Sequence, residues 1–232
     1  MIKEKIIKKI KKILKKHDMK TLDKIRYYDN KNMEIKRYSI YKKYLKFLGT
    51  NVKIDTGVFL YGMDFISIDD NTHIDKNCII IGSSPNLDLS HRVLKEKNNI
   101  YDKIQKGEVY IGKNCHVSQY SMIFGYGGIY IGNFCCLSTG AKIYSLTSMP
   151  INPFDNTQIV SILPYNEISP TLIGKVILED NTWLGINVVV SPGVTIKKNS
   201  FVRSNSFVLN SFEENSYIAG DPAIFRRKRF NI

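Results

Sequence analysis

The chain has 232 residues and a formal net charge of +13, which allows one large domain or one domain with an appendage. It contains no run of about 18 apolar residues and no apolar segment of the signal-peptide kind at its N-terminus, so we expect neither a membrane span nor a secretory signal, and a cytoplasmic location. The cysteines form no C-x-x-C pair, which argues against disulfides and zinc binding: they are Cys78, Cys115, Cys135 and Cys136.

The positive charge is concentrated at the N-terminus. Residues 1–48 hold 17 Lys/Arg and 5 Asp/Glu, a net of +12, whereas the remaining residues hold 17 and 16, a net of +1. The basic character is therefore local, and we do not interpret it as a nucleic-acid footprint.

This basic segment has helical periodicity. Over residues 2–16, aliphatic side chains fall on one face with lysines on the rest: Ile2, Ile6, Ile10, Ile13 and Leu14. Further helical stretches are expected over about 19–28 and 33–48. We favour a role as a helical cap on the open end of a repeat core. A compatible alternative is contact of residues 1–16 with anionic lipid or an acidic partner.

A hexapeptide repeat begins near Ile54. Its final block has an aliphatic residue at every sixth position, namely Leu178, Leu184, Val190, Ile196, Val202 and Val208. A small residue follows each of the first five by four positions: Thr182, Val188, Val194, Ser200 and Ser206. Neither a helix of period 3.6 nor an alternating strand has a period of six. The pattern predicts a chain that turns a corner every six residues, with the aliphatic residue inside and the small one at the corner.

Breaks in the register define coils and insertions. With three sides per coil, five coils are expected at 68–80, 111–123, 131–143, 178–190 and 196–208. Insertions at 82–107 and 145–172 then fall at one corner, where stacked loops commonly build a binding surface. The first has helical spacing around 88–104, and the second is rich in Pro, Asn and Ser and is expected to be an irregular flap. The predicted organisation is a helical segment 1–48, a β-coil domain 49–217 and a basic tail 218–232.

The register also predicts a column of side chains from distant parts of the chain. The position before the second aliphatic mark of each coil should stack on one outward edge, and it is occupied by His73, His116, Cys136, Trp183 and Phe201. Because strand side chains alternate, these residues should face outward and not into the core.

The repeat and the tail resemble a known family. The run from Trp183 through Val194, together with the motif Ile218-Ala219-Gly220-Asp221-Pro222-Ala223 and the basic residues 226–229, is similar to the hexapeptide-repeat acyltransferases. The resemblance covers roughly residues 50–229. The family includes maltose, serine and xenobiotic acetyltransferases and sugar acetyltransferases of surface-polysaccharide pathways. It implies a mainly β fold, a left-handed parallel β-helix, and a homotrimer with acetyl-CoA in grooves between subunits.

The resemblance also implies a histidine general base, and the expected position is His116. Members similar to maltose acetyltransferase place it after the coil that ends here at Ile143, but residues 144–150 contain no histidine. A related subgroup carries a histidine motif ahead of a glycine-rich turn, and its equivalents here are His116-Val117-Ser118 and residues 125–128. Imidazole suits proton removal near neutral pH. The alternative is a histidine that is merely hydrogen-bonded on an edge.

Other site residues follow from the same resemblance. Substrate or oxyanion contacts are expected from Gly127, Gly128, Ser145 and His73, although the glycines are explained equally well by a tight turn. Acetyl-CoA contacts carry over to Gly185, Ile186, Ser204, Arg226 and Arg227, although residues 226–229 also fit a solvated charge run.

The expected activity is acetyl transfer from acetyl-CoA to a saccharide hydroxyl or amine, with no metal and no nucleic-acid partner. Two other classes were weighed. A metal-dependent carbonic anhydrase of this fold needs three histidine ligands, whereas only His73 and His116 lie in the repeat register. A non-catalytic scaffold is the other alternative.

Overall fold

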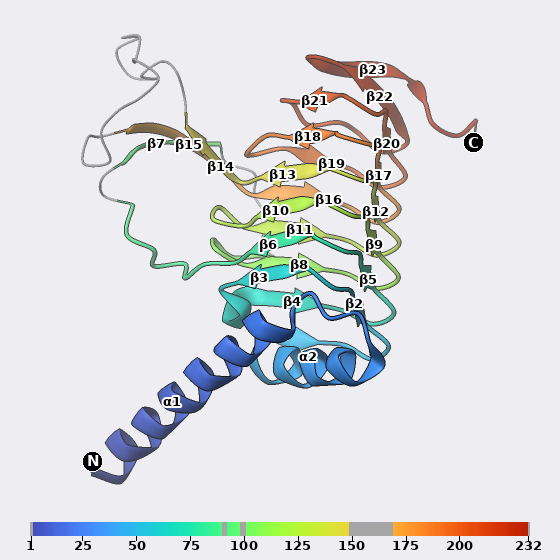
Figure 1. The fold of residues 1–232 in the computed structure, drawn as a ribbon. Helices are drawn as coiled ribbons and strands as arrows, with labels where there is room; N and C mark the ends of the chain where they lie inside the picture. The colour runs from blue at the N-terminus through green and yellow to red at the C-terminus, as the bar shows by residue number, and fades with distance from the viewer. Residues whose placement is uncertain (1, 90–91, 98–100, 149–168, 232) are drawn as a thin grey trace.

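The six-residue period forms a prism of short parallel strands (Figure 1). This computed structural model describes residues 2–89, 92–97, 101–148 and 169–231. The prism has three faces, which we call A, B and C. Face A contains β1 (Phe47–Leu48), β4 (Ile66–Ile68), β8 (Val109–Ile111), β11 (Ile129–Ile131), β16 (Val176–Leu178) and β19 (Thr195–Ile196).

Face B contains β2 (Lys53–Ile54), β5 (His73–Ile74), β9 (His116–Val117), β12 (Cys136–Leu137), β17 (Trp183–Leu184), β20 (Phe201–Val202), β22 (Ser216–Gly220) and β23 (Ala223–Lys228). Face C contains β3 (Phe59–Tyr61), β6 (Ile79–Ile81), β10 (Met122–Phe124), β13 (Lys142–Tyr144), β18 (Val189–Val190) and β21 (Phe207–Val208). The chain visits A, B and C in turn, so the described structure has six coils and not the five expected. The extra coil begins at β1, which lies inside the stretch 33–48 expected to be helical.

The core consists of the repeat's aliphatic residues. From Ile54 to Val208, every predicted aliphatic mark is at most 7% exposed. The small corner positions are equally covered, at 3% or less in Cys78, Cys115 and Cys135. Burial of a large aliphatic side chain stabilises the fold by roughly 1.5–3 kcal/mol. The predicted period of six and its inward face are therefore confirmed.

Two helices precede the coils. α1 spans Ile2–Ile25, and α2 spans Lys31–Tyr44 and lies beneath the first coil (Figure 1). Tyr41 of α2 is 1% exposed within the core, so α2 fits the expected cap. The buried Arg37 donates to the carbonyls of Ile25 and Tyr28 at 3.1 and 2.7 Å. A cation bound to carbonyl groups at a helix C-terminus is favourable, and it fixes the end of α1 on α2. A one-turn 3₁₀ helix, η1 (Met63–Phe65), follows β3.

The two long insertions meet in a small sheet. β7 (Arg92–Glu96) pairs in parallel with β15 (Ser169–Ile173), and β15 pairs antiparallel with β14 (Leu146–Ser148). The helix expected around 88–104 is therefore wrong for the described residues 92–97, because pairing between the insertions overrides local helical spacing. Residues 149–168 of the expected flap lie outside the described residues. Both insertions leave the prism at the corner between faces C and A, as predicted.

The C-terminal end of the chain differs from the expected basic tail. The stretch assigned to a basic tail forms most of a hairpin, in which β23 pairs antiparallel with β22 and extends face B.

Within the described residues, neither helix combines the length and apolar character needed to cross a bilayer.

Each corner requires a left-handed residue. At the A–B corner these are Asn51, Asn71, Asn114, Phe134, Asn181, Asn199 and Asn215, and at the B–C corner they are Gly57, Asn77, Tyr120, Gly140, Asn187 and Asn205. Asn and Gly tolerate positive φ, whereas a bulky residue there is strained. Phe134 and Tyr120, with φ of 57° and 60°, depart from the rule and are 63% and 55% exposed.

We predict that Phe134→Asn and Tyr120→Asn each raise the free energy of unfolding by about 1 kcal/mol. A bulky residue in the left-handed backbone region costs ~1–2 kcal/mol, whereas asparagine adopts this conformation readily. Chemical denaturation followed by circular dichroism measures this. The control is Phe47→Asn, which replaces a ring that is 49% exposed on strand β1 of face A and should bring no gain. A loss of stability at both corners would contradict the strain argument.

Candidate functional site

Face B carries the column of outward side chains that the register predicts. Successive strands pair Lys53 with His73, His73 with His116, His116 with Cys136, and then Trp183, Phe201 and Tyr217. The rings of His73 and His116 stack with centroids 5.4 Å apart and an angle of 20° between their planes. The two histidines are therefore neighbours, as expected.

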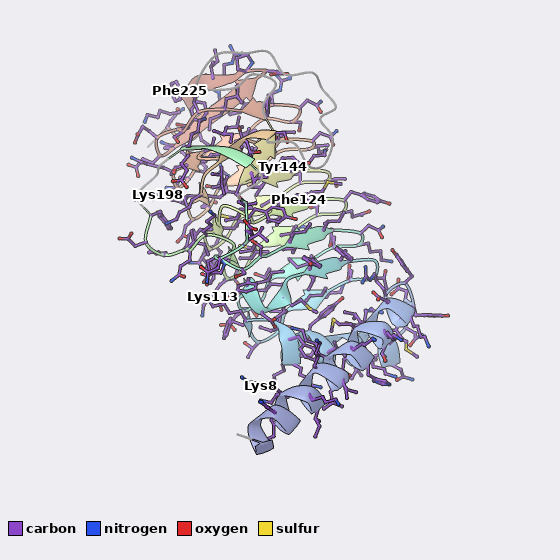
Figure 2. All side chains as sticks on the ribbon, turned by 90° about the vertical axis from the view of Figure 1, so that its left-hand side faces the viewer. Lys8, Lys113, Phe124, Tyr144, Lys198 and Phe225 are labelled. Carbon is purple, nitrogen blue, oxygen red and sulfur yellow. The ribbon has the colours of Figure 1, made fainter. Side chains whose placement is uncertain are left out.

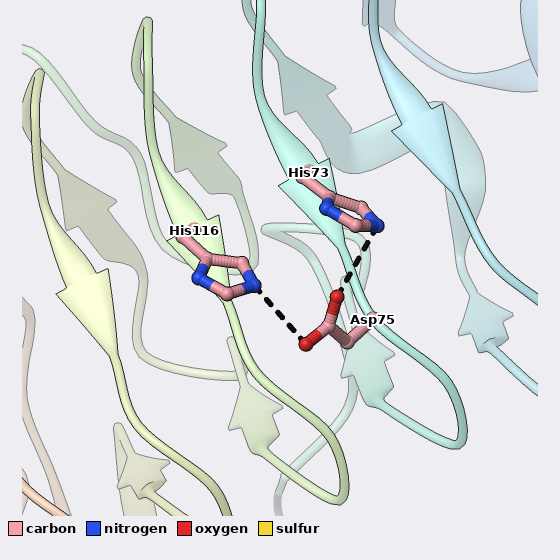
Figure 3. Close-up of side chains that lie close together, drawn as sticks. All are labelled: His73, Asp75 and His116. Atoms are coloured by element: carbon pink, nitrogen blue, oxygen red, sulfur yellow. Dashed lines mark hydrogen bonds and ion pairs between the residues drawn. The ribbon is translucent and has the colours of Figure 1, made fainter.

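Asp75 holds the two imidazoles together (Figure 3). Nε2 of His116 lies 3.0 Å from Asp75 Oδ2, and Nε2 of His73 lies 3.2 Å from Asp75 Oδ1. The Asp75 side chain is 17% exposed, against 49% for His116 and 33% for His73. The carboxylate is thus mostly covered by the imidazoles that it binds, while His116 remains open to a reactant.

The network continues toward the first coil. Nε2 of His73 also lies 3.2 Å from Asp55 Oδ2, and Lys53 Nζ lies 3.2 Å from Asp55 Oδ1. Basic and acidic side chains therefore alternate in a row across three coils: Lys53, Asp55, His73, Asp75 and His116. Each carboxylate is shared between two neighbours, so the row restricts both imidazole rings.

Sequence reasoning missed Asp75 and Asp55. Asp75 stands two positions after His73 of the predicted column, in His73-Ile74-Asp75, and Asp55 stands two positions after Lys53, which pairs with His73. Side chains at i and i+2 of a strand share a face, so the His-x-Asp spacing was a usable signal for the pair.

This arrangement suits proton transfer. If Nε2 of His116 carries the proton that it shares with Asp75, Nδ1 has the free lone pair and can accept a proton from a substrate. A carboxylate that orients an imidazole and stabilises the imidazolium after proton uptake is the basis of histidine-dependent nucleophile activation. His116 and Asp75 together can therefore act as a general base.

The same three side chains could also bind a metal ion. In the described part of the chain, His73, Asp75 and His116 offer ligand atoms that all lie within 4.8 Å of one another. Two histidines and one carboxylate are a plausible ligand set for a divalent transition metal. Their mutual hydrogen bonds give them an equally good role without one.

Exposed aromatic residues lie on face B or at its corners. Tyr120 and Phe134, the two strained corner residues, flank face B at the levels of β9 and β12, and Trp183 is 44% exposed on β17. The indole of Trp183 donates to Ser138 Oγ at 2.8 Å. Backbone strain kept at exposed rings beside a polar cluster is typical of functional sites.

The residues expected to contact acetyl-CoA lie on face B, which also carries His116, or at its B–C corner. Gly185, Ile186 and Ser204 lie at the B–C corner of the last two coils, where the Ile186 N–H donates to Ser204 Oγ at 3.1 Å. A Cβ on Gly185 would lie 2.6 Å from Ser204 N, so only glycine fits. With strands about 4.8 Å apart, β17 lies two spacings from β9, or roughly 10 Å.

The two arginines of this set lie on β23. Arg226 Nε donates to the Ala219 carbonyl at 3.3 Å, and the Arg227 guanidinium stacks 4.4 Å from the centre of the Tyr217 ring. Arg227 therefore continues the aromatic column of face B. Their positions suit an anionic group above the last coil.

The expected oxyanion residues lie elsewhere. Gly127 and Gly128 belong to the C–A corner, which is opposite face B, and Ser145 is fully buried there. The Gly127 N–H already donates to Ser145 Oγ at 2.8 Å, and the Gly128 N–H donates to the Gly125 carbonyl at 2.9 Å. The structure does not bring them together with His116, and it supports the tight-turn interpretation.

Burial raises the pKa of the Cys78 thiol to about 12, which disfavours thiol chemistry at the B–C corner.

Comparison with known proteins identifies the repeat. Residues 175–210 match the family model described as bacterial transferase hexapeptide (six repeats). This part of the chain is therefore a hexapeptide-repeat segment. The expected left-handed parallel β-helix is also supported by the fold of a hexapeptide-repeat acetyltransferase from Vibrio cholerae, which has 18% identity and a TM-score of 0.51 over 95% of this chain and 89% of that protein.

Relatives of this hexapeptide-repeat chain are acyltransferases. It is 29% identical over 115 residues to a probable macrolide acetyltransferase of Lysinibacillus sphaericus, covering 44% of this chain but only 60% of that relative. It is 26% identical over 186 residues to the dTDP-4-amino-4,6-dideoxy-D-glucose acyltransferase of Escherichia coli, covering 77% and 79%. A solved structure of AntD, an N-acyltransferase from Bacillus cereus, has 22% identity and a TM-score of 0.64 over 84% of this chain and 90% of AntD.

Proposed function

We propose that the chain is an acetyl-CoA-dependent acetyltransferase that acts on a saccharide hydroxyl or amine. The observation that carries the proposal is the half-exposed His116 held by the carboxylate of Asp75, 3.0 Å away. In the proposed reaction, His116 takes the proton of the acceptor as its oxygen or nitrogen attacks the thioester carbonyl. The bond to sulfur then breaks, and the departing sulfur takes the proton from the His116 imidazolium, so that CoA leaves as the thiol and His116 returns to its neutral form.

The acceptor class is supported by the relatives. One is described as an acyltransferase for a nucleotide-linked amino sugar and another as a probable macrolide acetyltransferase, and both acceptors bear hydroxyl or amine groups. The exposed rings of Tyr120, Phe134 and Trp183, on face B and at its corners, offer apolar surfaces to such an acceptor. A screen of nucleotide sugars and soluble glycans with free-thiol detection would identify it.

A trimer is supported by the apolar outer surface of face C. Its outward side chains are mostly aromatic or aliphatic: Phe59, Tyr61, Ile79, Ile81, Met122, Phe124, Tyr144, Val189 and Phe207. Phe124 and Tyr144 stack 5.1 Å apart, one above the other in Figure 2. A three-fold ring joins two different faces of neighbouring subunits. Contact through face C would place the adjoining face B, which carries His116, along a cleft between subunits.

We predict that His116→Ala lowers kcat by roughly 10²–10⁴-fold, the range for lost general-base catalysis. His73→Ala should cost much less, because His73 reaches the reacting base only through Asp75. The matched control is His17→Ala, which removes an imidazole that is 78% exposed on α1. Acetyl-CoA affinity, measured by calorimetry, should be unchanged in all three variants.

Three outcomes would redirect this proposal. Full activity of His116→Ala would assign the base to another residue. Loss of activity in the wild type on treatment with a chelator, restored by a divalent metal, would favour metal-dependent chemistry at His73, Asp75 and His116. An inability of the wild type to bind acetyl-CoA would favour the scaffold alternative.

Asp75→Asn should lower kcat by about 10²-fold while leaving KM for acetyl-CoA unchanged, because an amide cannot stabilise the imidazolium that forms in the transition state. Steady-state kinetics separate the two constants. Asp64→Asn, which removes an exposed carboxylate that pairs with Lys15 at 2.7 Å, is the control. An unchanged kcat in Asp75→Asn would show that the carboxylate only supports the fold.

Phe124→Lys combined with Tyr144→Lys should dissociate the trimer, because two charges would be buried at the proposed contact. Sedimentation velocity at micromolar concentration measures the change. Tyr27→Lys, at a ring that is 72% exposed outside the coils, should leave the assembly intact. A monomeric wild type would overturn the trimer and the cleft between subunits.

A further inference from the structure

We propose that the N-terminal half of α1 is an interfacial helix that binds a membrane surface bearing anionic lipid headgroups. This inference does not depend on the chemistry at His116. It explains a part of the molecule that neither the β-helix nor the proposed reaction uses.

The two halves of α1 have different surroundings. In the second half, Leu22 and Ile25 are buried, at 4% and 7% exposure, and Asp18 accepts hydrogen bonds from Lys43 Nζ at 2.6 Å and from the Tyr44 hydroxyl at 2.7 Å. These contacts attach the helix to α2. The first half extends beyond α2 away from the prism (Figure 1).

An apolar stripe continues along this projecting half. Its described members lie at helical spacing and are about half exposed: Ile7 at 51%, Ile10 at 51%, Ile13 at 59% and Leu14 at 49%. Isolated exposed aliphatic residues are common, but a contiguous stripe on a projecting helix indicates a surface that another apolar phase covers.

Lysines occupy the rest of the same turns. Those with exposed side chains are Lys5, Lys8, Lys9, Lys11, Lys12 and Lys16. Figure 2 places Lys8 at the end of the molecule opposite the C-terminal strands. A helix with lysines on one side, large aliphatic residues on the other and low overall hydrophobicity is typical of interfacial helices, which lie in the plane of the membrane surface.

The charge decides between possible occupants of the stripe. Three such helices packed side by side in a trimer would bring their lysines together, and like charges at short range repel. An anionic bilayer instead attracts each lysine and covers the aliphatic stripe at the same time. An anionic bilayer therefore covers the apolar face and attracts the basic face, whereas a second copy of the helix would cover the apolar face only.

The test uses the full-length protein and vesicles in a flotation assay. We expect binding to phosphatidylcholine vesicles that contain phosphatidylserine, much weaker binding to pure phosphatidylcholine, and release by high salt. The variant K5Q/K9Q/K12Q should reduce partitioning by about 100-fold, since each basic residue near the surface contributes a factor of about five. The variant I10S/I13S should reduce it by at least about tenfold through lost apolar burial.

The matched control is K36Q/K103Q/K198Q, which removes the same charge from exposed positions outside α1; it should bind as the wild type does. Equal binding by the wild type and both α1 variants would overturn the proposal. So would dissociation of the oligomer by I10S/I13S in the absence of lipid, which would assign the stripe to a second copy. Acetyl transfer to a soluble acceptor without vesicles is measured in parallel, and its presence or absence reports on the proposed reaction alone.

Discussion

The structure depends on the fit between a buried aliphatic column and a left-handed corner. Strands of two or three residues have too few hydrogen bonds to persist alone, and each is held because the coils above and below pair with it in register. The corner residue with positive φ sets where the chain turns, and Asn supplies that conformation at most A–B and B–C corners. If the turn came one residue later, the aliphatic side chains would face outward. The repeat therefore fixes the inside and the outside of the prism together.

The same register builds the candidate site. Because equivalent positions of successive coils lie directly above one another, residues separated by about 40 positions become neighbours, as His73 and His116 do. A strand has a second outward position two residues later, and this is where Asp55 and Asp75 stand. The site thus requires no loop of its own. Its groups are placed by the rigid pairing of face B, which restricts imidazole orientation far more than a flexible segment would.

Much of this could be predicted from the sequence because a period of six has one structural solution. The marks from Ile54 to Val208, the outward column and the single corner that carries both insertions all follow from it. Phe47–Leu48 were missed although Leu48 stands six residues before Ile54, because a two-residue strand resembles the end of the preceding amphipathic stretch. β7 was missed because its partner β15 lies more than 70 residues away, and local spacing contains no information about that pairing.

The site was predicted less completely. His116 and His73 followed from the column, but the contacts of Asp75 depend on side-chain distances that a register does not give. Gly127 and Gly128 illustrate the reverse error. Their composition resembles an anion-binding turn, whereas their N–H groups close a corner against Ser145 and Gly125. The position of that corner, opposite face B, becomes evident only when the sides of the coil are counted in three dimensions.

The row from Lys53 to His116 has a consequence for local opening of the molecule. Its members come from the first three coils, and in a stack with nearest-neighbour contacts the terminal units fray most readily. The first coil is an end of the stack, but α2 covers it, and Arg37 anchors α1 to α2 through two carbonyl groups. The helical segment thus raises the cost of opening at the end where Asp55 and His73 stand. Fraying is left to the opposite end, where Arg226 and Arg227 lie on the last strand.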